Sequence, residues 1–308
     1  MLLRTENLTK RYGKFLALDQ MNLEVDEGEI FGFVGPNGAG KTTTMRILAT
    51  LMTATAGDAY IDDISVRKSP FAIRKVVGYM PDFFGVYDNL RVSEYLEFYA
   101  DANNIPKRDW KAITKQLLEL VNSSDKENAF VDSLSRGMKQ RLCLARCLIH
   151  DPKLLILDEP SSGMDPQARA EVKYILRALK EQGKSIFISS HILPELGELC
   201  DRIAIINHGT LVTMGTMDEI SRNLGGQNKI KLTFLSEEDM EQAIAVLRAF
   251  PFVGEIVRED KMLEVAMDGD EKEAAELQRA LILAGVNLTS FQRSVQSLEQ
   301  IFLEVISQ

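Results

Sequence analysis

The segment Gly35–Thr43, which reads GPNGAGKTT, constrains the fold of this 308-residue chain more than any other stretch. It follows the apolar run Ile30–Val34 and precedes a stretch of helical spacing that carries Met45, Leu48 and Leu51. A glycine, four residues and then Gly-Lys-Thr, placed between a strand and a helix, is the pattern of a P-loop. The sequence therefore predicts a phosphate-binding loop that connects a β-strand to an α-helix.

The residue types in this loop suit a polyphosphate. Its glycines lack Cβ atoms, so several backbone N–H groups can converge on phosphate oxygens, and the following helix points its free amides at the anion. We expect Lys41 to reach the β- and γ-phosphates and the Thr42 hydroxyl to ligate Mg²⁺. A plain glycine turn would not explain the Lys-Thr pair. The predicted nucleotide contacts of the loop are Gly35, Pro36, Asn37, Gly38, Ala39, Gly40, Lys41, Thr42 and Thr43.

The length and the charge of the chain narrow the function classes. A chain of 308 residues is long enough for about two domains. The net charge of −9 is unevenly placed, because residues 227–308 hold 8 Lys/Arg against 15 Asp/Glu. An acidic tail of this kind disfavours nucleic-acid binding.

Apolar runs such as Leu154–Leu157 are far too short to span a membrane, and Arg4 and Glu6 interrupt any signal-peptide core. We therefore expect a cytoplasmic protein that is at most peripheral to a membrane. The three cysteines form neither an even disulfide set nor a CxxC pair, which favours reduced packing residues.

The first part of the chain reads as strands, and the next part as helices. Residues 2–34 form short apolar stretches with turn signals between them, which predicts β-strands that lead into the loop. Helical spacing over 92–121, split at Asn103–Pro106, predicts a helical subdomain at about residues 90–150. The aromatic loop Met80–Tyr87 either folds back on the core or lines a groove that receives a partner helix.

Two further motifs carry chemistry. Ser135 is placed to cap a helix that begins in the segment Ser133–Arg141, and this helix start is a second anion seat. The apolar run Leu154–Leu157 predicts a buried strand of a parallel sheet, and two carboxylates follow it. Joined to a P-loop, Asp158 is expected to hold Mg²⁺ and Glu159 to orient the attacking water.

The order of a P-loop, a later Leu-Ser-x-Gly motif and a strand that ends in Asp-Glu resembles the ABC-transporter ATPase family, over roughly residues 1–220. In that family two ATPase domains pair head to tail, and the signature helix of one presents Ser and Gly to the γ-phosphate held by the other. The resemblance assigns these roles to Ser135 and Gly137. Where the family usually has Leu-Ser-Gly-Gly-Gln, this chain has Arg136 and Met138 as departures.

The resemblance implies roles for other residues as well. His191 occupies the switch-histidine position and is expected to touch the γ-phosphate, so it joins Lys41 and Glu159 as a catalytic residue. Tyr12 would stack on the adenine. Asp82 stands at the Q-loop position, where Gln is commoner, and its carboxylate is an expected Mg²⁺ contact. The segment Ser161–Asp165 matches the D-loop, whose Asp165 is expected to cross the dimer interface.

The end of the chain predicts a separate small domain. Residues 223–228 look like a linker between an ATPase domain at 1–222 and an accessory domain at 229–308. Beyond the linker the periodicity gives βαββαβ, the ferredoxin-like split unit. A last helix is expected to begin with Ser297 and Gln300 in capping-box spacing. We expect this domain to serve dimerisation or regulation.

The predicted fold class is therefore α/β: a P-loop ABC ATPase domain with a helical subdomain, plus a small α+β ferredoxin-like C-terminal domain. The resemblance implies an ATP-hydrolysing transporter subunit with ATP and Mg²⁺ as cofactors, a homodimer on ATP binding, a separate transmembrane permease and no nucleic acid. The permease would hold the protein at the inner face of the cell membrane.

Within that family, the segment Lys41–Met45, the signature LSRGM and the segment Ser297–Phe302 resemble bacterial exporters of drugs, lipids or polysaccharides. An importer ATPase with a regulatory tail and a non-transport ATPase switch stay open as alternatives. ATPases of DNA repair or translation would need a coiled-coil insertion or a second ATPase domain, which this sequence lacks.

Overall fold

The computed structural model describes residues 1–82, 85, 89–192, 196–223 and 228–294. Its contacts divide the chain into two compact units, Met1–Met217 and Asp218–Gln308. Each unit has its own hydrophobic core. The predicted linker at 223–228 falls largely outside the described residues, and the predicted domain boundary stays a prediction.

A six-stranded sheet forms the centre of the first unit, in the order β11-β10-β4-β9-β8-β7. Its strands are β4 (Ile30–Val34), β7 (Val77–Met80), β8 (Leu154–Leu157), β9 (Ser185–Ser190), β10 (Arg202–Asn207) and β11 (Thr210–Gly215). All neighbours pair in parallel except β10 and β11, which form an antiparallel hairpin at the edge. Every residue of β4, β8 and β9 is buried, as the continuous apolar runs predicted.

A second, antiparallel sheet has the order β2-β1-β5-β6, and β3 also pairs with β1. Its strands are β1 (Leu3–Tyr12), β2 (Phe15–Met21), β3 (Glu24–Val25), β5 (Ala56–Ile61) and β6 (Ile64–Ser65). Leu3, Leu8 and Leu18 of this sheet join Phe31 and Phe33 of β4 in one core. The N-terminal strands predicted from the alternation are confirmed.

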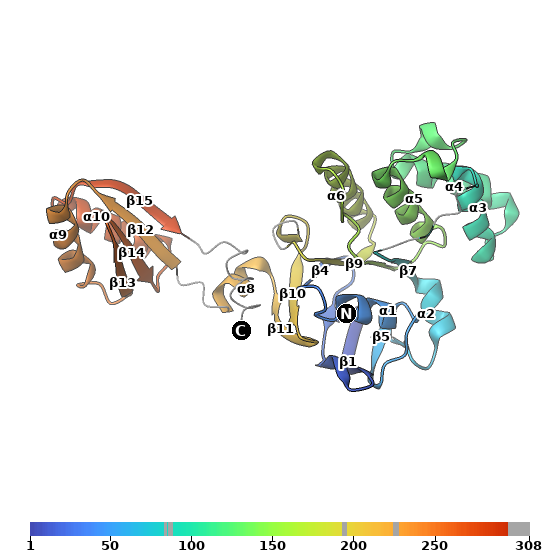
Figure 1. Cartoon of the computed structure of the whole chain (residues 1–308), viewed down its shortest axis with the longest axis horizontal. Helices are drawn as coiled ribbons and strands as arrows, with labels where there is room; N and C mark the ends of the chain where they lie inside the picture. Colours follow the sequence, from blue (N-terminus) through green and yellow to red (C-terminus); the bar gives the residue numbers. More distant parts are fainter. Residues whose placement is uncertain (83–84, 86–88, 193–195, 224–227, 295–308) are drawn as a thin grey trace. The chain divides into compact units, whose positions relative to one another are not determined.

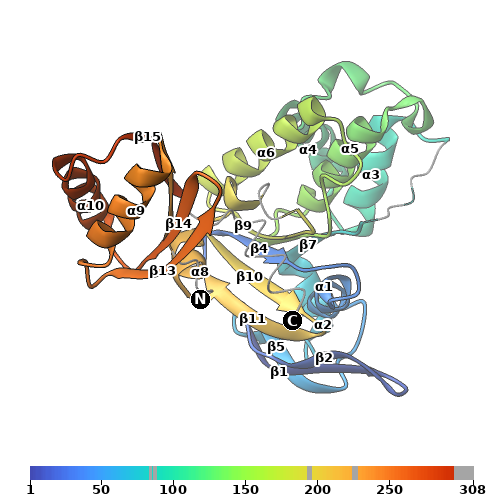
Figure 2. The same ribbon diagram turned by 60° about the vertical axis from the view of Figure 1, so that its left-hand side comes forward.

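Helices cover both faces of the parallel sheet (Figures 1 and 2). On one side lie α1 (Lys41–Leu48) and α2 (Pro70–Val76), and on the other lie α5 (Arg136–Leu148) and α6 (Pro166–Glu181). Apolar residues of α6 at helical spacing, namely Val172, Ile175, Leu176 and Leu179, are buried. The interior strands β4 and β8 thus lie in a sheet that helices cover on both faces.

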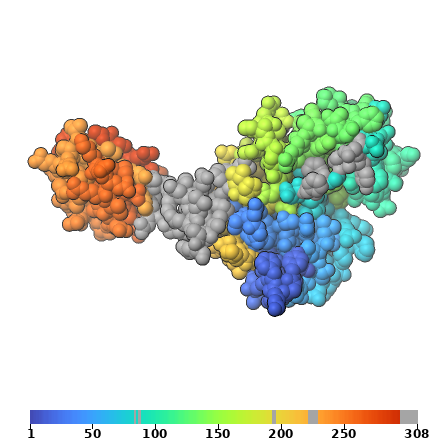
Figure 3. Space-filling model, in the orientation of Figure 1, coloured from blue at the N-terminus to red at the C-terminus, as the bar shows by residue number. Residues whose placement is uncertain are grey.

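The helical segment predicted at about residues 90–150 contains α3 (Val92–Ala102), α4 (Trp110–Leu120) and α5. The break between α3 and α4 falls at the predicted Asn103–Pro106. Figure 3 shows this segment in green at the upper right, with the N-terminal strands in blue below it. The aromatic loop at 80–87 lies mostly outside the described residues, so both interpretations of it stay predictions.

The predicted extent of the P-loop helix was wrong at its end. Helix α1 stops at Leu48, and Leu51 is 61% exposed instead of continuing the buried stripe. Thr50 adopts a positive φ of 62°, which turns the chain out of the helix. The apolar residue that follows therefore points to solvent.

The second unit has the predicted βαββαβ order. It contains β12 (Asn228–Phe234), α9 (Glu237–Leu247), β13 (Val253–Glu259), β14 (Met262–Met267), α10 (Glu271–Leu283) and β15 (Leu288–Ser294), after α8 (Met217–Asn223). The antiparallel sheet order β13-β14-β12-β15 is that of the ferredoxin-like fold. The predicted last helix, including Ser297 and Gln300, lies outside the described residues.

Candidate functional site

The carboxyl ends of the parallel strands bring the predicted site residues to one edge of the sheet. The P-loop follows β4, Asp82 follows β7, Asp158 follows β8 and His191 follows β9. In an open α/β sheet this edge is where ligands bind. The topology alone therefore gathers residues that lie far apart in the sequence.

A cavity of about 400 Å³ opens at this edge. Predicted residues from the P-loop line it, together with the predicted Tyr12, Asp82, Glu159 and His191. Its lining consists of Tyr12, Phe15, Ala17, Pro36, Asn37, Gly38, Gly40, Lys41, Thr42, Thr43, Asp82, Glu159, Ser162 and His191. The predicted contacts Gly35 and Ala39 do not line it; they belong to the buried base of the loop.

The P-loop adopts the conformation that its glycines allow. Gly38 and Gly40 have φ values of 83° and 110°, in the region that other residues rarely occupy. A Cβ on Gly35 would lie 2.4 Å from the backbone oxygen of Ile206, so the loop is pressed against β10. The Lys41 ammonium donates to the carbonyl oxygens of Gly35, at 2.6 Å, and Pro36, at 3.2 Å.

Lys41 connects the loop to two acidic residues. It is only 6% exposed, and burial lowers the pKa of its ammonium, although the Glu159 and Asp158 charges oppose that shift. The Lys41 Nζ lies 3.7 Å from Glu159 Oε1, and the other carboxylate oxygen of Glu159 lies 2.7 Å from His191 Nδ1. The three predicted catalytic residues thus form one line across the cavity.

The backbone of Glu159 is unusual, because this residue has a φ of 52°. Such a conformation persists in a non-glycine residue only when its surroundings impose it. Here the Glu159 N–H donates to the Ser189 hydroxyl at 3.0 Å. The carboxylate is thereby turned from the end of β8 toward Lys41 and His191.

Asp158 has the features of a metal ligand. It is fully buried, and the Ser189 hydroxyl donates to its Oδ1 at 2.8 Å. Its Oδ2 has no hydrogen-bond partner among the described residues. Burial raises the pKa of this carboxyl, while the Ser189 and Thr42 hydroxyls oppose the rise. A buried carboxylate oxygen left open beside a threonine hydroxyl fits Mg²⁺, which prefers oxygen ligands and takes others from phosphates.

Asp82, the third predicted metal contact, lines the same cavity and is exposed. Its charge acts on Asp158 in the direction that raises the pKa of that carboxyl. Among the described residues no group of three or more His, Cys, Asp or Glu side chains could hold a metal by itself.

Two aromatic residues of the β1–β2 hairpin flank the P-loop in the 400 Å³ cavity. Tyr12 and Phe15 face each other across the β1–β2 hairpin and are 44% and 62% exposed. The Lys10 ammonium lies 5.2 Å from the centre of the Tyr12 ring. Sequence reasoning named Tyr12 but missed Phe15, and also missed Ser162. The two-residue turn Gly13-Lys14 is the signal that would have paired Phe15 with Tyr12.

Ser135 and Gly137 do not line this cavity. Ser135 caps α5 as predicted, because its hydroxyl accepts from the Met138 N–H at 3.3 Å. Gly137 packs within α5 toward α6, where an added Cβ would lie 3.2 Å from Ala168 Cβ. Asp165, expected at a dimer interface, caps α6 of its own chain through the Ala168 N–H.

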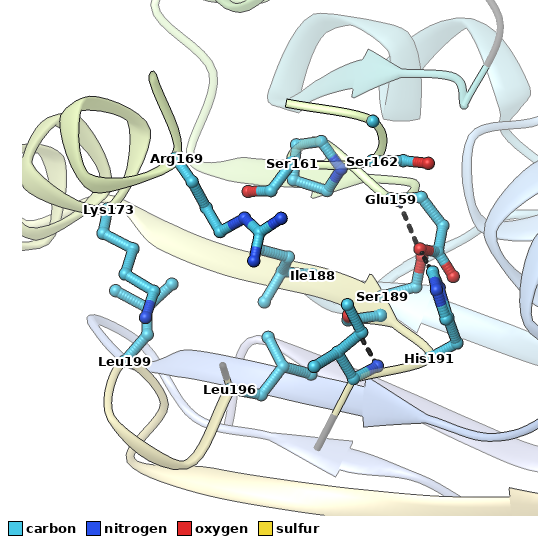
Figure 4. Close-up of a pocket in the computed structure, with 14 residues that line it drawn as sticks. Glu159, Ser161, Ser162, Arg169, Lys173, Ile188, Ser189, His191, Leu196 and Leu199 are labelled. Atoms are coloured by element: carbon cyan, nitrogen blue, oxygen red, sulfur yellow. Dashed lines mark hydrogen bonds and ion pairs between the residues drawn. The ribbon is translucent and has the colours of Figure 1, made fainter. Parts of the chain in front are cut away.

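A second, smaller cavity of about 130 Å³ lies behind the Glu159–His191 pair (Figure 4). In Figure 4 the Glu159–His191 contact forms one side, and Arg169 and Lys173 of α6 lie across from it. Ser161 and Ser162 of the D-loop lie between the two sides. Glu159, Ser162 and His191 line both cavities, so these three residues lie between them.

Comparison with known families decides the identity. The family model described as ABC transporter matches residues 18–162, and one for the C-terminal domain of DrrA1-3-like ATP-binding proteins matches residues 215–306. The bacitracin transport ATP-binding protein BcrA of Bacillus licheniformis is 33% identical, over 99% of this chain and 97% of that protein. The chain belongs to the ABC transporter ATP-binding proteins.

Other relatives extend over nearly the whole ABC ATPase chain. The daunorubicin resistance ATP-binding protein DrrA3 of Streptomyces coeruleorubidus is 33% identical over 96% of this chain and 93% of its own length. The linearmycin resistance ATP-binding protein LnrL of Bacillus subtilis is 29% identical over 99% and 98%. A solved ATP-binding subunit of an ABC transporter, 29% identical, superposes with a TM-score of 0.67 over 73% of this chain and 94% of its own.

These findings confirm the predicted family, fold class and ATPase activity of the chain. A dimeric ATP-binding cassette in a post-hydrolysis state with ADP and Pi shares the fold, with a TM-score of 0.64, 24% identity and coverage of 70% of this chain and 99% of its own. The buried cysteines Cys143, Cys147 and Cys200 are free thiols, as predicted. Among the described residues of the ABC ATPase no helix has both the length and the apolarity to cross a membrane.

Proposed function

We propose that this ABC ATPase binds Mg-ATP in the 400 Å³ cavity, closes as a head-to-tail homodimer and drives export through a separate membrane permease. The observation that carries the proposal is the line Lys41–Glu159–His191 at the mouth of a P-loop, with the open Oδ2 of buried Asp158 beside Thr42. Such a site supplies each group that phosphoryl transfer to water needs.

The residues of the cavity divide the work. The P-loop amides and the Lys41 ammonium would hold the phosphates, and Thr42 and Asp158 would hold Mg²⁺, with Asp82 nearby. Bound Mg²⁺ would neutralise negative charge on the phosphates. Tyr12 and Phe15 offer aromatic faces for the adenine.

In this proposal Glu159 is the general base. Its carboxylate, turned out from β8, would accept a hydrogen bond from the attacking water and so orient and polarise it. The contact at 2.7 Å from His191 Nδ1 supports this direction of the carboxylate, and the imidazole would then be available to the γ-phosphate. Lys41 balances the charge of Glu159 until phosphates arrive.

The position of the signature residues supports the head-to-tail dimer. Ser135 and Gly137 begin α5 outside the cavity of their own chain, so a second copy would bring them to a nucleotide. The dimeric neighbour shows that the fold supports pairing of two cassettes. Two copies would then form two composite sites.

The permease would dock on the helical segment. Phe98 of α3 and Phe130, next to the start of α3, are 47% and 48% exposed. Arg91 lies over the Phe130 ring at 5.1 Å, so the surface joins an aromatic face to a cation. Aromatic residues and arginine are enriched at protein interfaces.

The relatives favour export. BcrA is described as a bacitracin transport protein, and DrrA3 and LnrL as daunorubicin and linearmycin resistance proteins. Both the ATPase part and the C-terminal part of this chain align with them. We infer an amphipathic antibiotic-like or lipid-like cargo, whose contacts lie in the permease.

The test is co-purification and transport with a polytopic membrane protein from the same cells. We expect the pair to be isolated together and inside-out vesicles to accumulate daunorubicin or bacitracin when ATP is added outside. Phe98→Asp and Phe130→Asp should release the ATPase from membranes, while Tyr174→Asp, at a site 70% exposed on α6, should not. Retention of all three variants, or ATP-driven loss of cargo from inside-out vesicles, would contradict the proposal.

A further inference from the structure

A buried glutamine ties the signature helix to the D-loop of the same chain. The Gln140 side chain of α5 is 3% exposed, and its Nε2 donates to the backbone oxygen of Ser162 at 3.3 Å. Gln140 lies one turn into the helix that Ser135 begins. Ser162 lies in the D-loop and lines both cavities beside Glu159.

The D-loop in turn holds the backbone of Glu159. The Ser162 N–H donates to the Glu159 carbonyl oxygen at 3.0 Å, so two consecutive hydrogen bonds lead from Gln140 to the catalytic residue. Glu159 has the rare φ of 52°, and the position of its backbone determines where its carboxylate points. The Gln140 amide thus acts on the residue whose direction matters most for hydrolysis.

A second contact joins the same two segments. The guanidinium of Arg136, the first residue of α5, packs on Gly163. A Cβ added at Gly163 would lie 2.5 Å from the Cζ atom of Arg136. Gly163 has a φ of 67°. Farther along, Arg141 pairs with Glu171 of α6 at 2.6 Å. These contacts connect α5 to the D-loop and to the start of α6.

Stability alone does not account for Gln140. Its Oε1 is buried and has no hydrogen-bond partner in the part of the chain that the structure describes. A buried polar atom without a partner costs free energy, and an apolar side chain of the same shape removes that cost. The amide is therefore retained at a cost, which points to a role in function.

We propose that Gln140, supported by Arg136, is a positioning residue that couples the signature helix to Glu159 of its own chain. The inference rests on the proposed head-to-tail dimer, in which α5 contacts the partner's nucleotide. Hydrolysis by Glu159 at one site would then depend on nucleotide held at the other. In the proposed dimer each chain contributes its signature helix to one composite site and its Glu159 to the other. A coupling between these two parts of one chain therefore connects the two sites.

The first test is Gln140→Met, which keeps the volume and removes the amide. We expect kcat to fall about tenfold, with KM and the ATP affinity of the monomer unchanged, and the Hill coefficient for ATP to fall toward one. The unfolding free energy should change little, because the unpaired Oε1 is removed while the hydrogen bond to the Ser162 carbonyl oxygen is lost. The matched control Gln116→Met, at an exposed position of α4, should leave all these values unchanged.

The second test asks on which chain Gln140 acts. A scarce copy with intact Glu159 is mixed with a large excess of Glu159→Gln copies, so that nearly every working site has its Glu159 on the scarce copy. We expect Gln140→Met on the scarce copy to lower turnover about tenfold. The same change on the excess copy, which supplies the signature helix to that site, should lower turnover less than threefold.

A third mixture separates this inference from the proposed dimer. Excess Glu159→Gln copies that also carry Ser135→Arg should silence the scarce wild-type copy. If they do not, the head-to-tail arrangement is wrong and the coupling falls with it. If they do silence it, two results would still overturn the coupling. An effect of Gln140→Met from the excess copy alone would assign Gln140 to the signature contact. A joint loss of stability and kcat would assign Gln140 to the core.

Discussion

The Nζ atom of Lys41 lies 3.7 Å from Oε1 of Glu159, while the same ammonium donates to the Gly35 carbonyl oxygen at 2.6 Å. One buried cation therefore contacts both the P-loop backbone and the carboxylate that we propose as the catalytic base. Incoming phosphates would compete for this ammonium and leave Glu159 free to act on water. Binding and activation of the base are thus linked through one side chain.

Replacement of Lys41 tests this link. Lys41→Ala removes a buried positive charge at the centre of the phosphate loop, so we expect weaker ATP binding and a loss of hydrolysis of at least about 100-fold. Fluorescent-ATP titration and a phosphate-release assay measure the two effects. Unchanged turnover in a folded variant would refute the role of the P-loop lysine.

Glu159→Gln keeps the shape of the side chain and removes its charge. We expect ATP binding to persist, because Glu159 acts on water, and hydrolysis to fall by at least about 100-fold. ATP should then trap a closed dimer, seen as a shift from monomer to dimer in size exclusion with Mg-ATP. The double variant with Lys41→Ala is the control and should stay monomeric. Normal hydrolysis by Glu159→Gln would show that another group activates the water.

The site could be predicted where neighbouring residues in the sequence determine the geometry. The P-loop, the acids Asp158 and Glu159 after an apolar strand and the capped start at Ser135 are all set within a few residues of chain. Phe15 was missed because its place depends on hairpin register. The contact of Gln140 with Ser162 was missed because it depends on how two helices pack, which periodicity does not specify.

Two parts of the fold were not predicted, for the same physical reason. The edge hairpin β10–β11 and helix α6 were not predicted as elements, although Ile203, Ile205 and Ile206 are fully buried. Short apolar runs of this kind fit a strand or a helix equally well until a neighbour is known. Here β4 is the neighbour, and it pairs with β10 in parallel from Arg202 to Ile205.

Gly35 and Gly38 allow a matched test of the loop geometry. A Cβ at Gly35 would meet the Ile206 backbone oxygen at 2.4 Å, whereas one at Gly38 would have nothing within 4 Å. Gly35→Ala should therefore shift β10 or the loop and cost about 1 to 3 kcal/mol of unfolding free energy. Gly38→Ala should cost about 1 to 2 kcal/mol through its φ of 83° alone.

Backbone displacement distinguishes the two glycine variants more sharply than stability. Gly35→Ala should raise hydrogen exchange in β10, because the added methyl collides with that strand, and Gly38→Ala should leave β10 protected. Equal exchange in β10 for both variants would contradict the contact with Ile206.

His150 predicts a pH dependence of stability. Its Nε2 lies 3.0 Å from the Val77 carbonyl oxygen, and its buried Nδ1 has no hydrogen-bond partner among the described residues. Burial lowers the pKa of the imidazole below its usual value of about 6.5. Between the lowered pKa and 6.5 the unfolded chain binds more protons than the folded chain. The free energy of unfolding that neutral His150 contributes is therefore fully present above this pH range and is lost as the pH falls through it.

We therefore expect wild-type protein to lose unfolding free energy relative to His150→Gln when the pH falls from 7.5 to 5.5, by no more than about 1.4 kcal/mol per pH unit. Urea unfolding of both proteins at the two pH values measures the difference. Parallel pH dependences would show that His150 titrates alike in the folded and unfolded chains.

Ser135 gives the sharpest test of the composite site, because its hydroxyl caps α5 and yet does not line the cavity of its own chain. Ser135→Arg adds bulk and removes the cap, so it should block the ATP-driven dimer while ATP binding by the monomer stays within about twofold of wild type. Ser135→Ala, which removes the cap without the bulk, should cost about 1 kcal/mol of stability and weaken the dimer less. Mixing Ser135→Arg with Lys41→Ala places both defects in one site of the mixed dimer and leaves the other site intact, but the proposed coupling requires nucleotide at both sites, so turnover should stay well below half of the wild-type value. Monomer affinity is decisive: if Ser135→Arg loses ATP as severely as Lys41→Ala does, the serine serves its own chain's pocket and the head-to-tail arrangement is wrong.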